Sequence, residues 1–132
     1  MLASGGKDAL VKLWDLRHPS APLTVLPGHG RGGGVNCVAW RREGSSLLLA
    51  SAGSDKKVFL WDPCRSGAAS VPEGARFARG VVFIHPGHDA AVRSLSIGAC
   101  GSGLFASADA AGDVHVWQVA EGILQEYDNC MG

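Results

Sequence analysis

Three residue types that hydrolases use together occur in one part of the chain: His29, Ser51 and Asp55. In such enzymes a histidine takes the proton of a serine nucleophile, and a carboxylate orients the imidazole. The sequence lacks the G-x-S-x-G pattern that places a nucleophilic serine on a sharp turn between a strand and a helix. A hydrolase is therefore one alternative for these residues, and a structural role is the other.

Signals for a metal or a cofactor are weak. His85 and His88 are close in sequence, but no carboxylate or thiolate lies at a matching short spacing, and a closed zinc site needs about four ligands. The glycine-rich run 31–34 lacks the Gly-Lys-Ser/Thr ending of a phosphate-binding loop, and a strand is expected after it. We predict no metal and no cofactor. The cysteines contain no C-x-x-C pair, which favours reduced thiols in an intracellular protein: Cys37, Cys64, Cys100 and Cys130.

The composition excludes several classes of protein. Twelve basic residues balance twelve acidic ones among 132 residues, so a polybasic nucleic-acid or membrane binder is not expected. Nineteen glycines and six prolines predict many turns between short elements, and a hydrophobic fraction of 46% is enough for a folded core. No apolar run approaches the ~18 residues of a membrane-spanning helix, and the N-terminus has no features of a signal peptide.

The elements that must position these residues repeat along the chain. The segments 3–15, 50–62 and 106–118 align without gaps, and each ends in tryptophan followed by Asp or Gln. Two aliphatic residues alternate with a variable one before each tryptophan, which predicts a strand with one buried face. The aliphatic pairs are Val11/Leu13, Val58/Leu60 and Val114/Val116, and the variable residues are Lys12, Phe59 and His115. A short strand of small residues and a turn precede each of these strands.

These motifs resemble the WD-repeat β-propeller family, whose units carry Gly-His near the start and Trp-Asp at the end. Gly28-His29 with Trp61-Asp62 matches both, Trp14-Asp15 matches the end of a preceding unit, and Gly87-His88 with Trp117-Gln118 is a degenerate third copy. The resemblance implies an all-β fold, an incomplete β-propeller of four-stranded antiparallel blades. In that fold Asp, His and Ser have a structural role, so we predict that the protein is not an enzyme.

The resemblance also implies a hydrogen-bonded relay inside each blade, in which Asp55, His29, Ser51 and Trp61 follow one another. The last unit keeps His88, Ser107 and Trp117, but Ala111 stands where Asp8 and Asp55 stand in the other units; Asp109 and Asp113 are alternative replacements. We therefore expect the last blade to be looser, and Trp61→Ala to be more damaging than Trp117→Ala. In the first unit Asp8 and Trp14 are the corresponding residues.

The chain is expected to form one partial propeller over residues 1–132. A first blade, 1–26, lacks strand a; a second, 27–84, carries an insertion at 64–78; a third, 85–127, is followed by a tail, 128–132. Expected strands cover 1–15 (two strands), 22–26, 35–40, 46–52, 57–61, 79–84, 91–97, 104–108, 113–118 and 123–127. Since propellers close with roughly four to eight blades, we interpret the chain as the C-terminal part of a larger propeller. A short protein that completes its ring by self-association is the alternative.

As a function we predict a non-catalytic scaffold that presents propeller loops to peptides or proteins of a multiprotein complex, in the cytoplasm or nucleus, with no nucleic acid and no membrane as partner. The candidate partner-binding residues are Arg17, Arg31, Lys56 and Lys57. The last three are expected on one face, where they favour an acidic peptide. Trp14-Asp15-Leu16-Arg17 matches the W-D-x-R pattern of substrate receptors of cullin-RING ubiquitin ligases, which is a more specific alternative.

Overall fold

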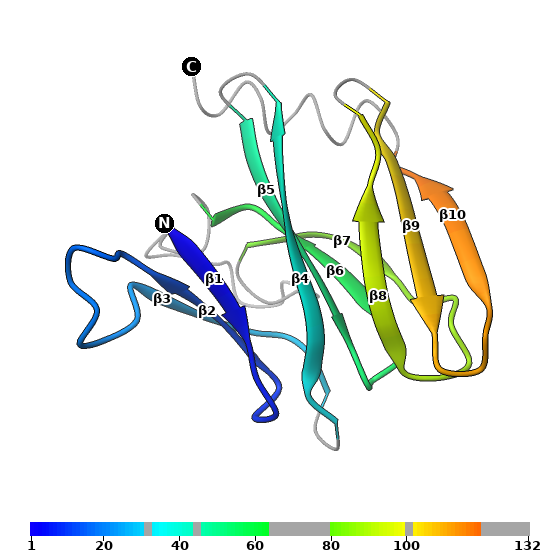
Figure 1. Ribbon diagram of the computed structural model, residues 1–132, viewed down its shortest axis with the longest axis horizontal. Helices are drawn as coiled ribbons and strands as arrows, with labels where there is room; N and C mark the ends of the chain where they lie inside the picture. Colours follow the sequence, from blue (N-terminus) through cyan, green and yellow to red (C-terminus); the bar gives the residue numbers. More distant parts are fainter. Residues whose placement is uncertain (31–32, 44–45, 64–79, 100–101, 120–132) are drawn as a thin grey trace, which may run out of the picture.

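The described part of the chain forms ten β-strands arranged in three antiparallel sheets (Figure 1). This computed structural model describes residues 1–30, 33–43, 46–63, 80–99 and 102–119. The first sheet contains β1 (Leu2–Gly5), β2 (Leu10–Trp14) and β3 (Thr24–Pro27). The second contains β4 (Val35–Glu43), β5 (Ser46–Gly53), β6 (Val58–Trp61) and β7 (Val81–His85). The third contains β8 (Val92–Ile97), β9 (Leu104–Asp109) and β10 (Val114–Gln118).

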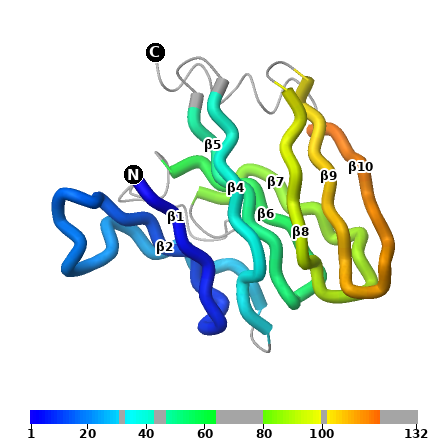
Figure 2. The backbone as a smooth tube through the Cα atoms, viewed as in Figure 1, coloured from blue at the N-terminus to red at the C-terminus, as the bar shows by residue number. Residues whose placement is uncertain are grey.

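Successive sheets lie side by side like the blades of a fan (Figure 2). Neighbouring strands in each sheet are consecutive in sequence, and β1 contacts β4 while β4 contacts β8. The predicted all-β fold, an incomplete propeller with antiparallel blades, is confirmed. The expected strand 123–127, the insertion 64–78 and the tail 128–132 lie outside the described residues.

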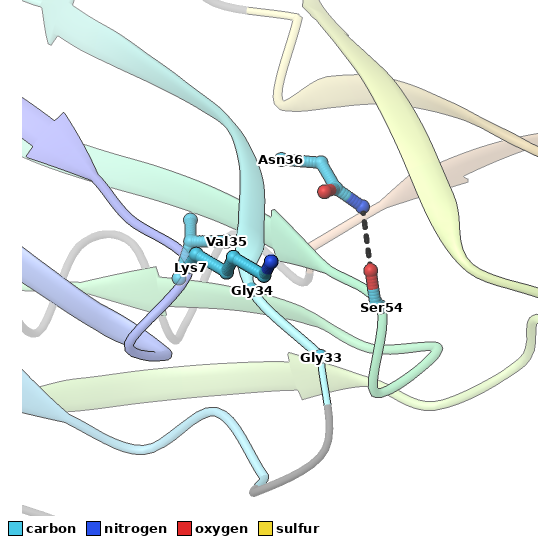
Figure 3. Close-up of a pocket in the computed structure, with 6 residues that line it drawn as sticks. All are labelled: Lys7, Gly33, Gly34, Val35, Asn36 and Ser54. Atoms are coloured by element: carbon cyan, nitrogen blue, oxygen red, sulfur yellow. Dashed lines mark hydrogen bonds between the residues drawn. The ribbon is translucent and has the colours of Figure 1, made fainter.

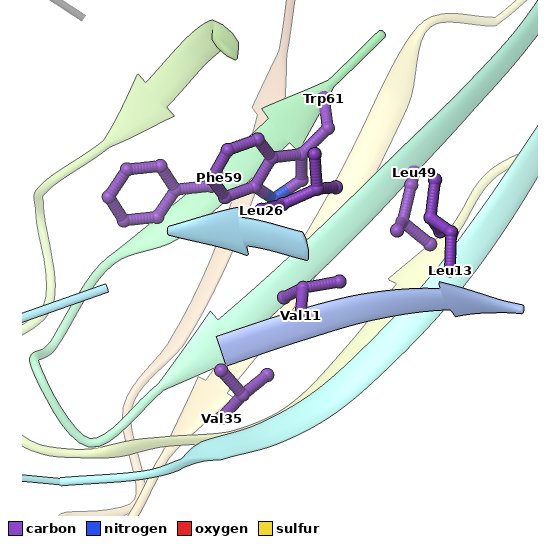
Figure 4. Close-up of a cluster of buried hydrophobic side chains, with 7 residues drawn as sticks. All are labelled: Val11, Leu13, Leu26, Val35, Leu49, Phe59 and Trp61. Carbon is purple, nitrogen blue, oxygen red and sulfur yellow. The ribbon is translucent and has the colours of Figure 1, made fainter. Parts of the chain in front are cut away.

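The middle sheet is buried on both faces because a sheet packs on each side of it. One face contributes Leu49, Phe59 and Trp61 to a core shared with the first sheet (Figure 4). The opposite face packs Leu60 and its neighbours against Phe105 of the third sheet. All four residues of β6 are therefore buried. The alternation of side chains along a strand explains how one strand supplies two cores.

The expectation of a buried aliphatic face fails in the third sheet. Val11 and Leu13 are buried in β2, but the equivalent Val114 and Val116 of β10 are 65% and 70% exposed. Among the described residues, no sheet packs on that side of β10. The aliphatic face of the strand is therefore buried in the first two sheets but exposed in the third. Burial of these positions depends on a neighbouring sheet and not on the strand itself.

The turns that join β1 to β2, β5 to β6 and β9 to β10 each contain one residue in the left-handed backbone region. The φ angles are 65° at Ala9, 70° at Lys56 and 95° at Gly112, which are equivalent positions in the three aligned segments. Glycine adopts this conformation without steric strain, whereas alanine and lysine do not. The three turns therefore share a left-handed residue at the same place, although only the last has glycine there.

Candidate functional site

The relay in the second sheet brings together four side chains from a loop, a turn and two strands. The Trp61 indole Nε1 donates to Ser51 Oγ over 2.8 Å, and His29 Nε2 lies 2.7 Å from the same oxygen. His29 Nδ1 lies 3.0 Å from Asp55 Oδ1. Since an indole N–H only donates, the Ser51 hydroxyl must donate to His29, which leaves Nδ1–H to donate to the carboxylate. Every member of the relay is thus satisfied, and the four side chains lock the turn, the loop and two strands together.

A second complete relay occurs in the third sheet, and Asp109 closes it. His88 Nδ1 lies 2.9 Å from Asp109 Oδ2, His88 Nε2 lies 2.6 Å from Ser107 Oγ, and Trp117 Nε1 donates to Ser107 over 3.2 Å. Of the two replacements that the sequence left open for the carboxylate at Ala111, Asp109 contacts His88. The expectation of a looser last blade therefore has no support from a missing carboxylate. The Asp109 carboxylate reaches His88 from the end of β9, two residues earlier, and it also accepts from the Ala111 backbone N–H.

Asp8 does not join a relay of this kind. Its carboxylate accepts from the Leu10 backbone N–H and lies 3.4 Å from the Lys12 ammonium, on the surface of the turn. Trp14 Nε1 donates to Ser4 Oγ over 2.9 Å, so the inner part of the pattern is present without a histidine. Among the described residues, no imidazole contacts the Asp8 carboxylate, so the relay of the other two sheets is not repeated here.

The hydrogen bonds of the relays lower the pKa of both relay carboxyl groups. At Asp55, burial acts to raise the pKa, but the hydrogen bonds from His29 and from the Gly30 and Lys57 backbone N–H groups outweigh it, so the pKa is lowered. At Asp109, the hydrogen bond from His88 is the main cause of the lowered pKa. Both carboxylates are held in the ionised form that a histidine N–H donor requires.

The trio His29, Ser51 and Asp55 does not present an accessible nucleophile. Ser51 is 0% exposed, and its oxygen is already bonded to the Trp61 indole and the His29 ring. A substrate carbonyl would have to come within about 3 Å of that oxygen for attack. This geometry supports a structural role for the three side chains inside the second sheet.

A polar hollow lies where the loop before β4 meets the turns of the first two sheets (Figure 3). It has a volume of about 470 Å³ and is lined by Lys7, Gly33, Gly34, Val35, Asn36 and Ser54. A Cβ on Gly33 would lie 2.2 Å from Ser54 Cβ, and one on Gly34 would lie 2.7 Å from Lys7 Cα. The two glycines are thus required for the close approach of the loop to both turns.

A β-bulge directs Asn36 into this hollow. The register of β4 against β5 shifts between Val35 and Cys37, so Asn36 is the extra residue. Its Nδ2 donates to Ser54 Oγ over 3.1 Å and to the Val92 carbonyl over 2.8 Å, which ties the second sheet to the third. Asn36 was not predicted from the sequence, because the bulge at this residue has no local sequence signature.

The hollow carries positive charge. Among the described residues that line it, Lys7 is the only charged one. Lys56 and Lys57 are exposed in the turn that begins at Ser54, whereas the neighbouring Asp55 side chain is only 9% exposed and is engaged by His29. Arg31, the other basic residue expected on this face, lies outside the described residues.

Arg17 occupies a different site, in the loop between β2 and β3. Its Nη2 lies 2.8 Å from Asp15 Oδ2 and its Nε 3.0 Å from Asp15 Oδ1, and the side chain is 85% exposed. Beside it lies a largely apolar hollow of about 580 Å³ lined by Met1, Asp15, Leu16, Arg17 and Leu23. The W-D-x-R motif is the only support for the ligase-receptor hypothesis, and the structure pairs its arginine with its own aspartate.

A histidine cluster was also missed by sequence reasoning. His85, His88 and His115 offer nitrogen atoms that all lie within 4.8 Å of one another. The sequence showed only His85 and His88; His115 occupies the position of β10 that varies freely between repeats, 30 residues beyond His85. Burial lowers the pKa of His85, and the neighbouring His115 and His88 lower it further.

Comparison with known proteins identifies one WD repeat in this chain and several similar proteins. The family model "WD domain, G-beta repeat" matches residues 20–62. The chain is 28% identical over 93% of its length to histone acetyltransferase type B subunit 2 of Candida glabrata, of which it covers 29%. It is 39% identical over 54% of its length to the WD repeat-containing protein 26 homolog of Drosophila melanogaster, covering 11% of that protein. It is 38% identical over 50% of its length to the protein transport protein SEC31 of Candida glabrata, covering 5%.

The fold, the paired relays and these similarities together define a β-propeller segment built from WD repeats. Residues 20–62 match a WD repeat, and the chain as a whole is similar to WD-repeat proteins. It spans under a third of the length of each of the three curated relatives named above.

Proposed function

We propose that the protein is a non-catalytic scaffold that binds acidic segments of partner proteins in the hollow lined by Lys7 and Asn36. The observation that carries this proposal is the charge of the hollow: Lys7 is the one charged side chain among the described residues that line it, and Lys56 and Lys57 are exposed in the turn that begins at Ser54, another lining residue. A carboxylate-bearing peptide is the ligand that such a surface attracts.

The polar lining supports the same ligand. The Ser54 hydroxyl and the Asn36 amide are ordered by their mutual hydrogen bond, and the two glycines bring the backbone to the surface beside them. An extended peptide needs such donors and acceptors along its main chain, whereas a nucleic acid needs a continuous basic groove, which a neutral chain does not favour.

Similarity to WD-repeat proteins supports protein partners more generally. One relative is named as a subunit of a histone acetyltransferase and another as a protein transport protein. By analogy, we propose that this chain acts within a multiprotein complex inside the cell, and that further blades or a second copy of the chain complete its ring. Within the described residues, no helix has the length and apolar character needed to cross a lipid bilayer.

The proposal is tested by fluorescence anisotropy with a labelled Asp/Glu-rich peptide and its Asn/Gln counterpart. We expect the acidic peptide to bind more tightly and to lose affinity as salt rises. Lys7→Glu and Lys57→Glu should each weaken binding by at least about 2- to 5-fold, which corresponds to the ~0.4–1 kcal/mol of an exposed ion pair. Arg17→Ala, in the loop between β2 and β3, is the matched control and should have no effect. Equal affinity for the two peptides would refute the proposal.

A further inference from the structure

The histidine cluster joins the second and third sheets. His85 is the last residue of β7, His115 lies in β10, and His88 lies in the loop between β7 and β8. His85 Nε2 is 3.1 Å from His115 Nδ1, and this is the one hydrogen bond that either ring makes within the described part of the chain. Both rings are partly exposed, so a solvent ion can reach them.

The separation of these two nitrogens is close to the separation that a metal ion requires. Zinc–imidazole bonds are about 2.0–2.1 Å long, so two imidazole nitrogens on a tetrahedral zinc ion lie roughly 3.3–3.4 Å apart. The observed 3.1 Å differs from that value by only a few tenths of an ångström. A small rotation of either partly exposed ring would bring both lone pairs onto a common point.

The surrounding rings restrict the orientation of both histidines. His85 stacks on Trp117 with centroids 4.8 Å apart and an angle of 5°, and His115 stacks on His88 at 3.9 Å and 12°. His88 is itself held by Asp109 and Ser107, which engage both of its ring nitrogens. Both ring nitrogens of His88 are therefore occupied, so His88 is not a metal ligand; its ring positions His115 by stacking.

The neighbouring repeat shows that the fold does not need histidine at these places. The segment Leu26-Pro27-Gly28-His29 aligns with His85-Pro86-Gly87-His88, and Phe59 aligns with His115. Leu26 and Phe59 belong to one apolar cluster between the first and second sheets. Between the second and third sheets the same two positions are His85 and His115. Unlike His88, neither of these histidines belongs to a relay, so their ring nitrogens remain available to a ligand.

We propose that His85 Nε2 and His115 Nδ1 bind one borderline transition-metal ion, such as Zn²⁺, across the junction of the second and third sheets, and that water completes its coordination. Imidazole nitrogen suits such ions. Each neutral ring carries one N–H. On binding, the proton that lies between the rings moves to the far nitrogen of its own ring, so both facing nitrogens offer a lone pair and the neutral pair loses no proton.

The test is a calorimetric titration of the full 132-residue chain with ZnCl₂, with thiols kept reduced. The variants His85→Leu and His115→Phe introduce the residues that the neighbouring repeat carries, so they are expected to fold. Each should weaken zinc binding at least about 10-fold, since even the loss of a group behind a ligand costs 10- to 100-fold. His18→Leu, an exposed histidine outside the cluster, is the control and should bind as the unaltered protein does.

Imidazole nitrogen-15 NMR then identifies the ligands. Zinc should shift the facing nitrogens of His85 and His115 and leave His18 unchanged. Unchanged affinity in His85→Leu and His115→Phe, or zinc-induced shifts confined to other residues, would overturn the proposal. Folding of each variant is checked by circular dichroism, so that lost binding is not confused with an unfolded chain.

Discussion

The two relay tryptophans provide a direct test of how a sheet on each side contributes to stability. Trp61 is 0% exposed and lies in the core between the first and second sheets, whereas Trp117 is only partly buried. Their indole N–H bonds to serine differ too, at 2.8 Å for Trp61 and 3.2 Å for Trp117. Since Asp109 completes the second relay, the ranking of these tryptophans rests on burial and not on a missing carboxylate.

We predict that Trp61→Ala destabilises the protein by about 3–5 kcal/mol, which is typical of a large buried aromatic side chain. Trp117→Ala should cost about half as much, because part of its ring is already in water. A domain of this size has a total stability of about 5–15 kcal/mol, so the first variant approaches unfolding at room temperature. In the matched pair Trp61→Phe and Trp117→Phe, an aromatic ring is kept and only the indole N–H is removed. Each change should lower the free energy of unfolding by about 1–3 kcal/mol, because the buried serine hydroxyl loses its hydrogen-bond donor.

The assay is urea unfolding followed by far-ultraviolet circular dichroism, which does not depend on the fluorescence of the altered tryptophan. A change of midpoint at constant m-value reports a change of stability. Equal midpoints for Trp61→Ala and Trp117→Ala, or a larger loss for Trp117→Ala, would show that the second neighbouring sheet does not add the burial that the structure indicates.

Three further predictions concern single side chains. Asp109→Ala should lower the melting temperature clearly more than Asp113→Ala, because only Asp109 contacts His88; equal shifts would argue against the second relay. The pKa of Asp55 is lowered in the folded state, so its ionised form stabilises the fold at pH values above the unfolded pKa of about 3.9. This stability is lost as the pH falls through the lower folded pKa. In Asp55→Asn the free energy of unfolding should therefore depend less on pH in this acidic range, as measured by urea unfolding at several pH values. Lys56→Gly should raise stability by up to ~1 kcal/mol, since Lys56 has a φ of 70°; a fall in the urea midpoint would contradict the strain argument.

The relays show what residue types alone can indicate. Trp donates, carboxylate accepts, and His and Ser do both, so the order of the four groups follows from their chemistry once the repeat is recognised. The position of the carboxylate does not follow, because side chains at two different places along the turn can reach one histidine. Asp109 reaches His88 from β9, and sequence comparison between repeats had marked Ala111 as the equivalent position.

The sequence by itself determined the local elements of this protein: period-two alternation before each tryptophan specifies strands, and glycine-rich segments specify the turns between them. Only the tertiary structure decided which of these strands have a covered face, since Val11 is buried and the equivalent Val114 is exposed. It alone also placed His115 against His85. The physical reason is that alternation is a property of one strand, whereas burial and side-chain contact depend on how neighbouring sheets pack.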